Sequence, residues 1–512
     1  MTKEVTLTLD WMIGMAISTN TMLVKTKYLF FGVLATFLLT SYAILEWKAP
    51  WVDECYTYYG INHDSFASFS NSIVSGINFS PPLYFFFNFL IHSIYPSSLE
   101  LLRFESIVWM LIGAVLCFYT AKRLVGDTAA FVGISLVLCN SDLLLNNSLE
   151  ARHYTMFFAC ASWVLYDFAR KEDGNFWEIP TFLAHLSLCL VHYFGIIFSG
   201  LIGLILLLQN KKFTIWKRLP ATLVASWIVS LSCYLILLSN QTSHLNTWPK
   251  INTLEALLAC YDGLGTLLFL LVPIVLCLIF SGLNNSGSIR WSKSFKPMFL
   301  VSLLWILTPF FAWLLSHVSE INLFKERYFM PKEAGLMLLI SFGCHWIFQF
   351  FSLPEKSTIC RSIVVSVPIC LVCIGLLGIN YKRTKFSLDS QQNYHHWLLA
   401  NEDLVNRDIP LVFSGDPVFF PNSYLHTNQS FLLINDDQMF GVYSRFSSKI
   451  KLVKETHLEN MDSFVLIADK KSLAISSPPK FFARDLGQFN QNLNLFCTLY
   501  EKSKNSKPSP KS

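Results

Sequence analysis

The sequence predicts an α-helical membrane protein that crosses the bilayer about eleven times and ends in a small α/β domain. Three observations carry this prediction. Hydrophobic residues make up 53% of the 512 residues and charged residues only 14%, about half the charged share of a soluble protein. Apolar runs of about 20 residues, the length that spans a bilayer, recur along most of the chain. Lysine and arginine gather in every second connection between these runs.

Eleven apolar segments qualify as membrane spans. Placing Lys25 and Lys27 in the cytoplasm puts the basic connections after the second, fourth, sixth, eighth and tenth spans on that same side. The odd number of spans then leaves the C-terminus outside. Segment 81–96 is also apolar, but it is short and has proline at both ends, so we expect an interfacial or re-entrant helix there. The expected spans are 28–45, 104–121, 128–146, 154–169, 178–192, 193–209, 219–238, 256–280, 298–316, 334–351 and 362–380.

The C-terminal part differs in composition from the rest of the chain. Runs such as IPLVFSG, IKLVKE and SFVLIAD alternate with Gly, Asp and Pro, which is typical of short strands in an α/β domain. The Asp416 carboxylate precedes a proline, as in an ordinary turn, and we assign it no chemistry. The predicted organisation is a cytoplasmic segment 1–27, a transmembrane domain 28–381 with an outer loop 46–103, an outer α/β domain 382–500 and a disordered basic tail 501–512.

Two adjacent carboxylates, Asp53 and Glu54, follow the first span directly. Alone, such a pair is usually a solvated feature of a loop. Cations at the same depth change this interpretation: Arg152 in LEARHY, and Arg327 in a loop that breaks the rule of positive charge inside. Together they suit a reaction on a lipid phosphate, in which the cations stabilise the departing phosphate and a carboxylate deprotonates the nucleophile.

The order of five motifs adds a resemblance to this argument. WVDE, SPPLYFFFNFLI, LLRFES, AKRLVGDTAAFVG and NSLEARHYTM follow one another within residues 28–210. In this order they resemble the N-terminal half of the GT-C superfamily, the membrane glycosyltransferases that use polyprenyl-phosphate sugars. These include protein O-mannosyltransferases, aminoarabinose transferases of lipid A and lipopolysaccharide-core galacturonate transferases. HYFG (192–195) and ERYFMP (326–331) resemble later landmarks of the same superfamily.

The resemblance implies roles for individual residues. Asp53 corresponds to the acid that activates the acceptor, and Glu54 to a neighbour that orients Asp53 or the acceptor. Arg152 is implied to hold the donor phosphate, with Glu150 fixing its guanidinium. The other residues implied to bind the donor are Arg327, Lys325, Tyr328, Tyr84 and His192.

The residues alone leave the roles of several side chains to be weighed. Ser80 stands where related sequences often carry His or Lys, and Lys325 or His92 is the expected substitute. A lone histidine in an apolar segment, such as His192, more often packs than binds. No cofactor is required: a divalent cation held by the outer carboxylates is the alternative, but the arginines already neutralise a phosphate, so we expect no metal. Cys370 and Cys373 lie in an apolar run without partner ligands, and we expect neither metal nor redox use there.

The sequence therefore predicts an inverting glycosyltransferase in the bacterial inner or plasma membrane. Its expected partners are a polyprenyl-phosphate sugar and a hydroxyl acceptor on a lipid, polysaccharide or protein at the outer face, and no nucleic acid. The alternative from another class is a transporter or flippase of lipid-linked sugars. Transporters usually carry charges or broken helices near the midplane, whereas the charges here gather at one face. A catalytically silent membrane scaffold is the third possibility.

Overall fold

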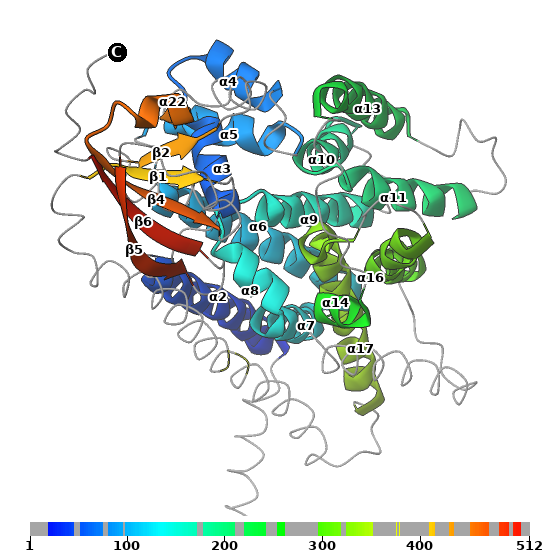
Figure 1. The fold of residues 1–512 in the computed structure, drawn as a ribbon. Coiled ribbons are helices and arrows are strands. Elements are labelled where there is room, and N and C mark those ends of the chain that lie inside the picture. The colour runs from blue at the N-terminus through cyan, green and yellow to red at the C-terminus, as the bar shows by residue number, and fades with distance from the viewer. Residues whose placement is uncertain are drawn as a thin grey trace, which may run out of the picture.

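Figure 1 shows the computed structural model of the chain, a body of helices with one β-sheet at its side. The structure describes residues 19–45, 52–74, 80–95, 98–170, 178–209, 220–241, 253–261, 295–318, 324–351, 375, 378, 409–414, 430–434, 451–469, 481–490 and 495–502. Cys370, Cys373, Asp416 and most of the predicted spans 256–280 and 362–380 lie outside these residues.

The longer described helices overlap predicted spans in sequence. They are α2 (Thr19–Ile44), α3 (Val52–Ile61), α4 (Phe66–Val74), α5 (Leu83–His92), α6 (Leu99–Val125), α7 (Asp127–Asn140), α8 (Asp142–Ser148), α9 (Tyr154–Arg170), α10 (Glu178–Val191), α11 (Gly195–Gln209), α13 (Ala221–Gln241), α14 (Leu254–Cys260), α16 (Phe295–Val318), the 3-10 helix η4 (Glu326–Phe329) and α17 (Pro331–Phe351).

Three of the described helices are long and apolar enough to cross a membrane by length and composition: α6, α13 and α16. The bent pair α7 and α8 adds a fourth if it counts as one span. The chain is therefore an integral membrane protein. Helix α5 has ten residues, which gives a length of about 15 Å, half of the hydrocarbon core. Segment 81–96 is thus too short for a span, as its sequence predicts.

The predicted span 128–146 is wrong as a single helix. Helix α7 ends at Asn140, α8 begins at Asp142, and the two are bent by 68°. Ser141 causes the restart, because its hydroxyl accepts a hydrogen bond from the Leu144 amide at 3.2 Å and so caps α8. Helix α8 therefore leaves the axis of α7, and one of its faces becomes a wall of the candidate site.

Close helix packing holds the body together at positions of small residues. A Cβ atom added at Gly133 in α7 would lie 2.5 Å from the backbone nitrogen of Ser341 in α17. The two helices therefore touch along their backbones at a point where only glycine fits. Helix α6, whose Met110, Ala114 and Cys117 are fully buried, packs against both α7 and α9 in the centre of the body.

We expect Gly133→Ala to lower the thermal unfolding temperature of the detergent-solubilised protein. The added methyl group forces α7 and α17 apart, an overpacking cost of about 1–3 kcal/mol. Gly200→Ala is the matched control, since a Cβ atom at Gly200 meets nothing within 4 Å. Equal unfolding temperatures for the two variants would show that the α7–α17 contact is not as tight as described.

The C-terminal domain is built on a six-stranded sheet of order β3-β2-β1-β4-β6-β5. Strands β3, β2, β1 and β4 are parallel, and β6 and β5 are antiparallel to their neighbours. Val412, Leu433 and Phe464 form part of its buried core. The strands are β1 (Leu411–Ser414), β2 (Ser430–Leu433), β3 (Leu452–Val453), β4 (Ser463–Asp469), β5 (Phe481–Asn490) and β6 (Leu495–Lys502), with the short helix α22 (Glu455–Leu458) between β3 and β4.

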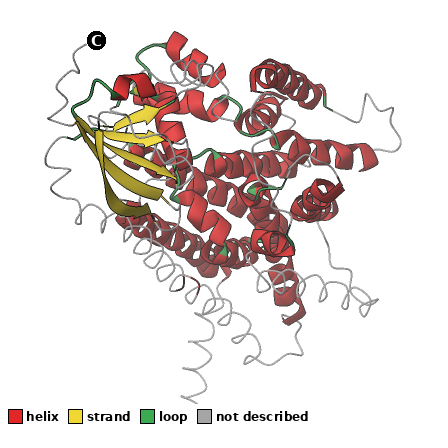
Figure 2. Cartoon of the chain, viewed as in Figure 1, coloured by secondary structure: helices red, strands yellow, loops and turns green. Residues whose placement is uncertain are grey.

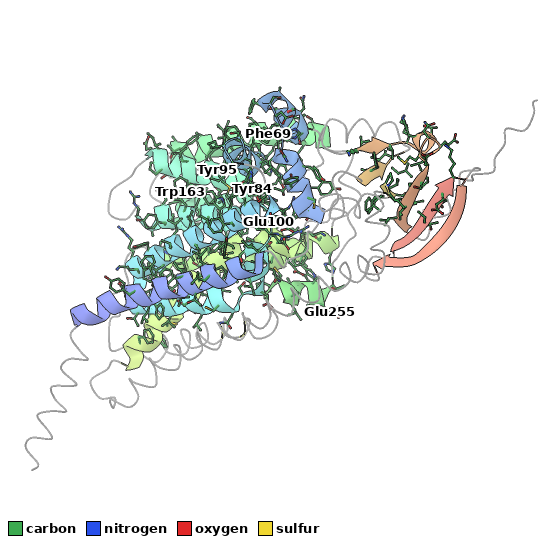
Figure 3. All side chains as sticks on the ribbon, turned by 90° about the vertical axis from the view of Figure 1, so that its left-hand side faces the viewer. Phe69, Tyr84, Tyr95, Glu100, Trp163 and Glu255 are labelled. Carbon is green, nitrogen blue, oxygen red and sulfur yellow. The ribbon has the colours of Figure 1, made fainter. Side chains whose placement is uncertain are left out.

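Three of these strands, β1, β3 and β4, lie where the sequence predicts them, while β2, β5 and β6 were not anticipated. Strand β6 continues to Lys502, so the ordered domain extends two residues beyond its predicted end. Figure 2 shows the sheet as a separate yellow layer beside the red helices. In Figure 3 it lies past the end of the helical body at which α2 finishes, on the side of α3.

Candidate active site

The two adjacent carboxylates lie in the first turn of α3. Asp53 is 7% exposed and Glu54 is completely buried, so neither is a solvated loop residue. Consecutive residues of an α-helix point about 100° apart, which sends the two side chains to different partners. The pair therefore divides into two separate ionic contacts.

Asp53 lies between two arginines that come from distant parts of the chain. Its Oδ2 atom is 2.7 Å from Nη2 of Arg327 in η4 and 4.0 Å from Nη2 of Arg152, in the turn before α9. Arg152 is fixed independently, because its Nη1 donates to the backbone oxygen of Asp53 at 3.0 Å and to Thr57 Oγ1 at 3.3 Å. One carboxylate and two guanidinium groups thus form a single cluster of charged groups.

Glu54 forms the second ionic contact, with Arg103 of α6. Arg103 donates through Nε and Nη2 to the two carboxylate oxygens at 2.9 and 2.7 Å, a bidentate pair. Glu54 also accepts from the Ala151 amide at 2.9 Å, and Arg103 donates to the Leu45 backbone oxygen at 3.1 Å. This pair ties the end of α2, the start of α3, α6 and the Ala151 turn together. Glu54 thus contacts the scaffold, whereas the sequence predicts that it orients Asp53 or the acceptor.

Both arginines of the site remain charged. Burial lowers the pKa of Arg152, but the Asp53 carboxylate and Tyr154 together more than offset this, so its pKa is raised. Burial likewise lowers the pKa of Arg327, and Tyr154, Asp53 and Glu150 together raise it further than burial lowers it. The pKa of the half-buried Lys325 is lowered, first by burial and then by the neighbouring Arg327. The site is a cationic cluster with Asp53 inside it.

Tyr154 is a residue of this site that the sequence did not single out. The guanidinium carbons of Arg152 and Arg327 lie 5.9 and 5.4 Å from the centre of its ring, within the range of cation–π attraction. Its place in NSLEARHYTM, directly after Arg152 and His153, is the signal that was available. Arg103 was equally visible in LLRFES, but its sequence does not say which carboxylate it meets.

Glu150, which the sequence predicts to fix the Arg152 guanidinium, lies in the same turn as Arg152. The Arg152 backbone amide donates to the Glu150 backbone oxygen at 2.8 Å, and Ser106 Oγ donates to the same oxygen at 2.6 Å. The Arg152 guanidinium is held by Asp53 and Thr57, while the Glu150 carboxylate stabilises the charge of Arg327. Glu150 therefore fixes the turn through its backbone and faces Arg327 with its side chain.

The remaining residues predicted to bind the donor lie deeper or elsewhere. Tyr84 is completely buried, with its ring 6.0 Å from that of His153. His192 Nδ1 accepts from the Phe194 amide at 3.1 Å, and its ring lies 4.8 Å from that of Tyr328, contacts that fit packing. His92 does not reach Asp53: its Nε2 is 3.7 Å from Glu105 Oε1. Of the two candidates to replace a basic residue at Ser80, only Lys325 lies beside Arg327.

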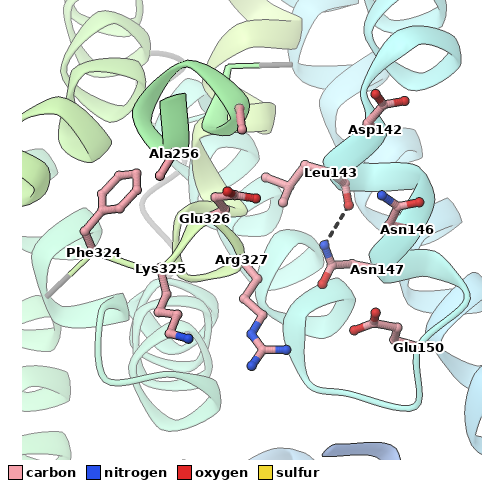
Figure 4. Close-up of a pocket in the computed structure, with 11 residues that line it drawn as sticks. Asp142, Leu143, Asn146, Asn147, Glu150, Ala256, Phe324, Lys325, Glu326 and Arg327 are labelled. Carbon is pink, nitrogen blue, oxygen red and sulfur yellow. Dashed lines mark hydrogen bonds between the residues drawn. The ribbon is translucent and has the colours of Figure 1, made fainter. Parts of the chain in front are cut away.

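An open cavity of about 590 Å³ adjoins Arg327 (Figure 4). One wall is the face of α8 and the turn after it, and the other is α14 with the segment leading into η4. Glu150 and Arg327 belong both to the cavity lining and to the surroundings of Asp53. The lining residues are Asp142, Leu143, Asn146, Asn147, Glu150, Ala256, Ala259, Phe324, Lys325, Glu326 and Arg327. Within the described residues, no three His, Cys, Asp or Glu side chains gather as a metal site.

His153 makes the stability of this region depend on pH. Burial, followed by His192 and the arginines Arg152 and Arg327, lowers the pKa of His153 well below its usual value. The unfolded chain therefore binds a proton at about pH 6.5 and the folded chain does not, so folding stability falls as the pH drops below that value, by up to about 1.4 kcal/mol per pH unit.

We expect the unfolding temperature in detergent to fall between pH 7.5 and 5, and to fall less steeply in His153→Asn. Ser80, whose Oγ is 3.5 Å from His153 Nδ1, provides the matched control: Ser80→Ala removes the neighbour but no titrating group and should retain the parent's slope. The same slope in His153→Asn and in the parent would contradict the buried, neutral histidine.

Comparison with solved structures identifies the fold. The crystal structure of ArnT from Cupriavidus metallidurans in the apo state matches with a TM-score of 0.59 at 10% identity, over 93% of this chain and 98% of that chain. The chain has the ArnT fold. ArnT bound to undecaprenyl phosphate matches with a TM-score of 0.56 at 12% identity, over 91% of this chain and 97% of that chain. The likeness to ArnT agrees with the resemblance that the motif series indicates.

The other comparisons add no further information on the fold. An oligosaccharyltransferase from Archaeoglobus fulgidus, tethered with an acceptor peptide, has a TM-score of 0.45 at 10% identity, over 93% of this chain and 74% of that chain. No family model and no curated protein matches the sequence.

Proposed function

We propose that this protein is an inverting glycosyltransferase that moves a sugar from a polyprenyl-phosphate carrier to a hydroxyl acceptor at the outer face of the membrane. The observation that carries the proposal is the Asp53 carboxylate, 2.7 Å from Arg327 and 4.0 Å from Arg152. A carboxylate beside two permanent cations is what a reaction with a phosphate leaving group requires. The fold supports the donor class, because ArnT of this fold is known bound to undecaprenyl phosphate.

The chemistry is a single displacement. The acceptor oxygen forms a bond to the anomeric carbon while the bond from that carbon to the phosphate oxygen breaks. Asp53 takes the hydroxyl proton, and Arg152 and Arg327 receive the negative charge that develops on the leaving phosphate. A phosphate is a weak base, so no general acid is needed.

The ion pair between Asp53 and Arg327 couples these two tasks. In the structure Arg327 holds the carboxylate, and a carboxylate paired with a cation is a poorer base. A donor phosphate that binds Arg327 competes for its guanidinium and releases Asp53. The base is thus strongest when the donor is in place, which limits its reactivity in the empty enzyme.

The experiment is a reaction in vesicles that contain the purified protein and a radiolabelled undecaprenyl-phosphate sugar, with membrane-extract acceptors outside. We expect label on the acceptor together with free undecaprenyl phosphate, and loss of both in Arg327→Gln. Glu255→Gln, an exposed acid on α14 outside the site, is the control and should react as the parent does. If the intact labelled lipid crosses the bilayer and its sugar is never released, the protein is a transporter and the proposal fails.

A further inference from the structure

The cavity beside Arg327 has two chemically different walls. Among the described lining residues, the α8 wall carries the carboxylates of Asp142 and Glu150 with the carboxamides of Asn146 and Asn147 and no cation. Lys325 and Arg327 belong to the opposite wall, together with the Glu326 carboxylate. In Figure 4 the side chains of Asp142, Asn146 and Glu150 follow one side of the space, and those of Lys325 and Arg327 lie across from them. A ligand that fills this cavity meets amides and acids on one side, and two cations with one acid on the other.

The broken helix produces the α8 wall. Because α8 restarts at Ser141 and turns by 68° from α7, Asp142 and Asn146 stand four residues apart on one helical face, and Glu150 continues the row just past its end. Asn146 is exposed and Asp142 is half-buried, so both are accessible from the cavity. A continuous α7 would carry these residues along the axis of the span and away from Arg327.

The size and polarity of the space indicate what it takes. A volume of about 590 Å³ is within the range of small-molecule sites and is ample for a sugar ring. Ala256 and Ala259 on α14 have the small side chains that leave this room. Carboxylate and carboxamide groups accept and donate hydrogen bonds in the pattern that vicinal hydroxyls need. The polyprenyl chain is excluded, because burying it against these polar groups would desolvate them without compensation.

We infer that the α8 wall is a sugar-binding subsite, in which Asp142 and Asn146 select a polyhydroxylated ring that carries no acidic group. This inference rests on the proposed function, because it places the phosphate of the donor on the wall of Lys325 and Arg327 and the ring of a sugar on the wall of α8. Acidic substituents are disfavoured because two carboxylates and no cation line this wall, and like charges repel at such distances. The ring belongs either to the donor or to a carbohydrate acceptor, which share this chemistry.

The test measures binding of three lipids to the full-length protein in detergent: undecaprenyl phosphate, its neutral hexose conjugate and its hexuronic acid conjugate. We expect the hexose lipid to bind about ten-fold more tightly than the bare lipid, the worth of one or two good hydrogen bonds. Asp142→Asn and Asn146→Ala should lose most of this difference and leave the affinity for the bare lipid unchanged. Glu255→Gln, an acid next to the cavity but not in its lining, should change nothing.

The most decisive part of the test is a variant that gains affinity for one of the lipids, since misfolding cannot cause a gain. Asp142→Lys should bind the hexuronic acid lipid about ten-fold more tightly than the parent does, because it places a cation opposite the sugar carboxylate. If the hexuronic acid lipid binds the parent more tightly than the hexose lipid, the selection against acidic sugars is wrong.

The outcomes also separate the two sources of the ring. If Asp142→Asn and Asn146→Ala leave all lipid affinities unchanged but raise the KM for a carbohydrate acceptor, the subsite holds the acceptor. If they change neither the lipid affinities nor that KM, there is no sugar subsite on α8. A parent that binds none of the three lipids would instead overturn the proposed function, independently of α8.

Discussion

Asp53→Asn should abolish sugar transfer while donor binding persists. The amide keeps the size of the carboxylate but cannot accept the proton of the acceptor hydroxyl, and loss of a general base costs about 10²–10⁴-fold in rate. Since Asn also removes a negative charge from beside Arg152 and Arg327, affinity for the anionic donor should rise or stay level. This opposite movement of kcat and donor affinity identifies a base, because a residue that only holds the donor would lose both.

The measurement uses initial rates of label transfer with saturating donor, together with donor binding at equilibrium. Glu255→Gln removes a carboxylate from an exposed position on α14 outside the site and controls for a lost carboxylate as such; it should retain kcat at saturating donor. Asp53→Asn with a parental kcat would show that another group takes the proton.

Glu54→Ala and Arg103→Ala should each unfold or severely destabilise the protein. Both side chains are buried, and each is the bidentate partner of the other. Removing one leaves an unpaired buried charge, at a cost of about 3–5 kcal/mol. Glu54→Ala also removes the acceptor of the Ala151 amide, so the turn that carries Arg152 loses this anchor.

The double variant Glu54→Leu with Arg103→Met decides whether the pair acts through its charges. Replacing a buried pair by apolar residues of similar volume is often neutral, so we expect the double variant to recover most of the lost unfolding temperature. Its activity should remain low, because Ala151 and Leu45 are not held by apolar side chains. Unfolding temperatures that fall additively would mean that Glu54 and Arg103 contribute separately.

The sequence and the structure agree best where hydrophobic length decides the outcome. Helices such as α6 and α9 lie where apolar runs predict them, because a buried or lipid-facing helix needs only composition and length. The break at Ser141 was missed, because leucine-rich sequence continues on both sides of it and the cap is a single hydroxyl. Local hydrogen bonding overrides a smooth hydropathy pattern there.

Side-chain partners were less predictable than helices. The grouping of Asp53, Arg152 and Arg327 follows from the predicted spans, which place all three in outer loops. The partner of Glu54 does not follow, since Arg103 is 49 residues away and only the packing of α3 on α6 brings them together.

The central claim is that an acceptor hydroxyl, deprotonated by Asp53, displaces the phosphate in one step. The anomeric configuration of the product tests it most directly, measured by NMR after transfer from a polyprenyl-phosphate sugar of known configuration. A single displacement inverts that configuration, and we predict the inverted product. A product with retained configuration would require a covalent glycosyl-enzyme intermediate, and it would contradict the assignment of Asp53 as a base.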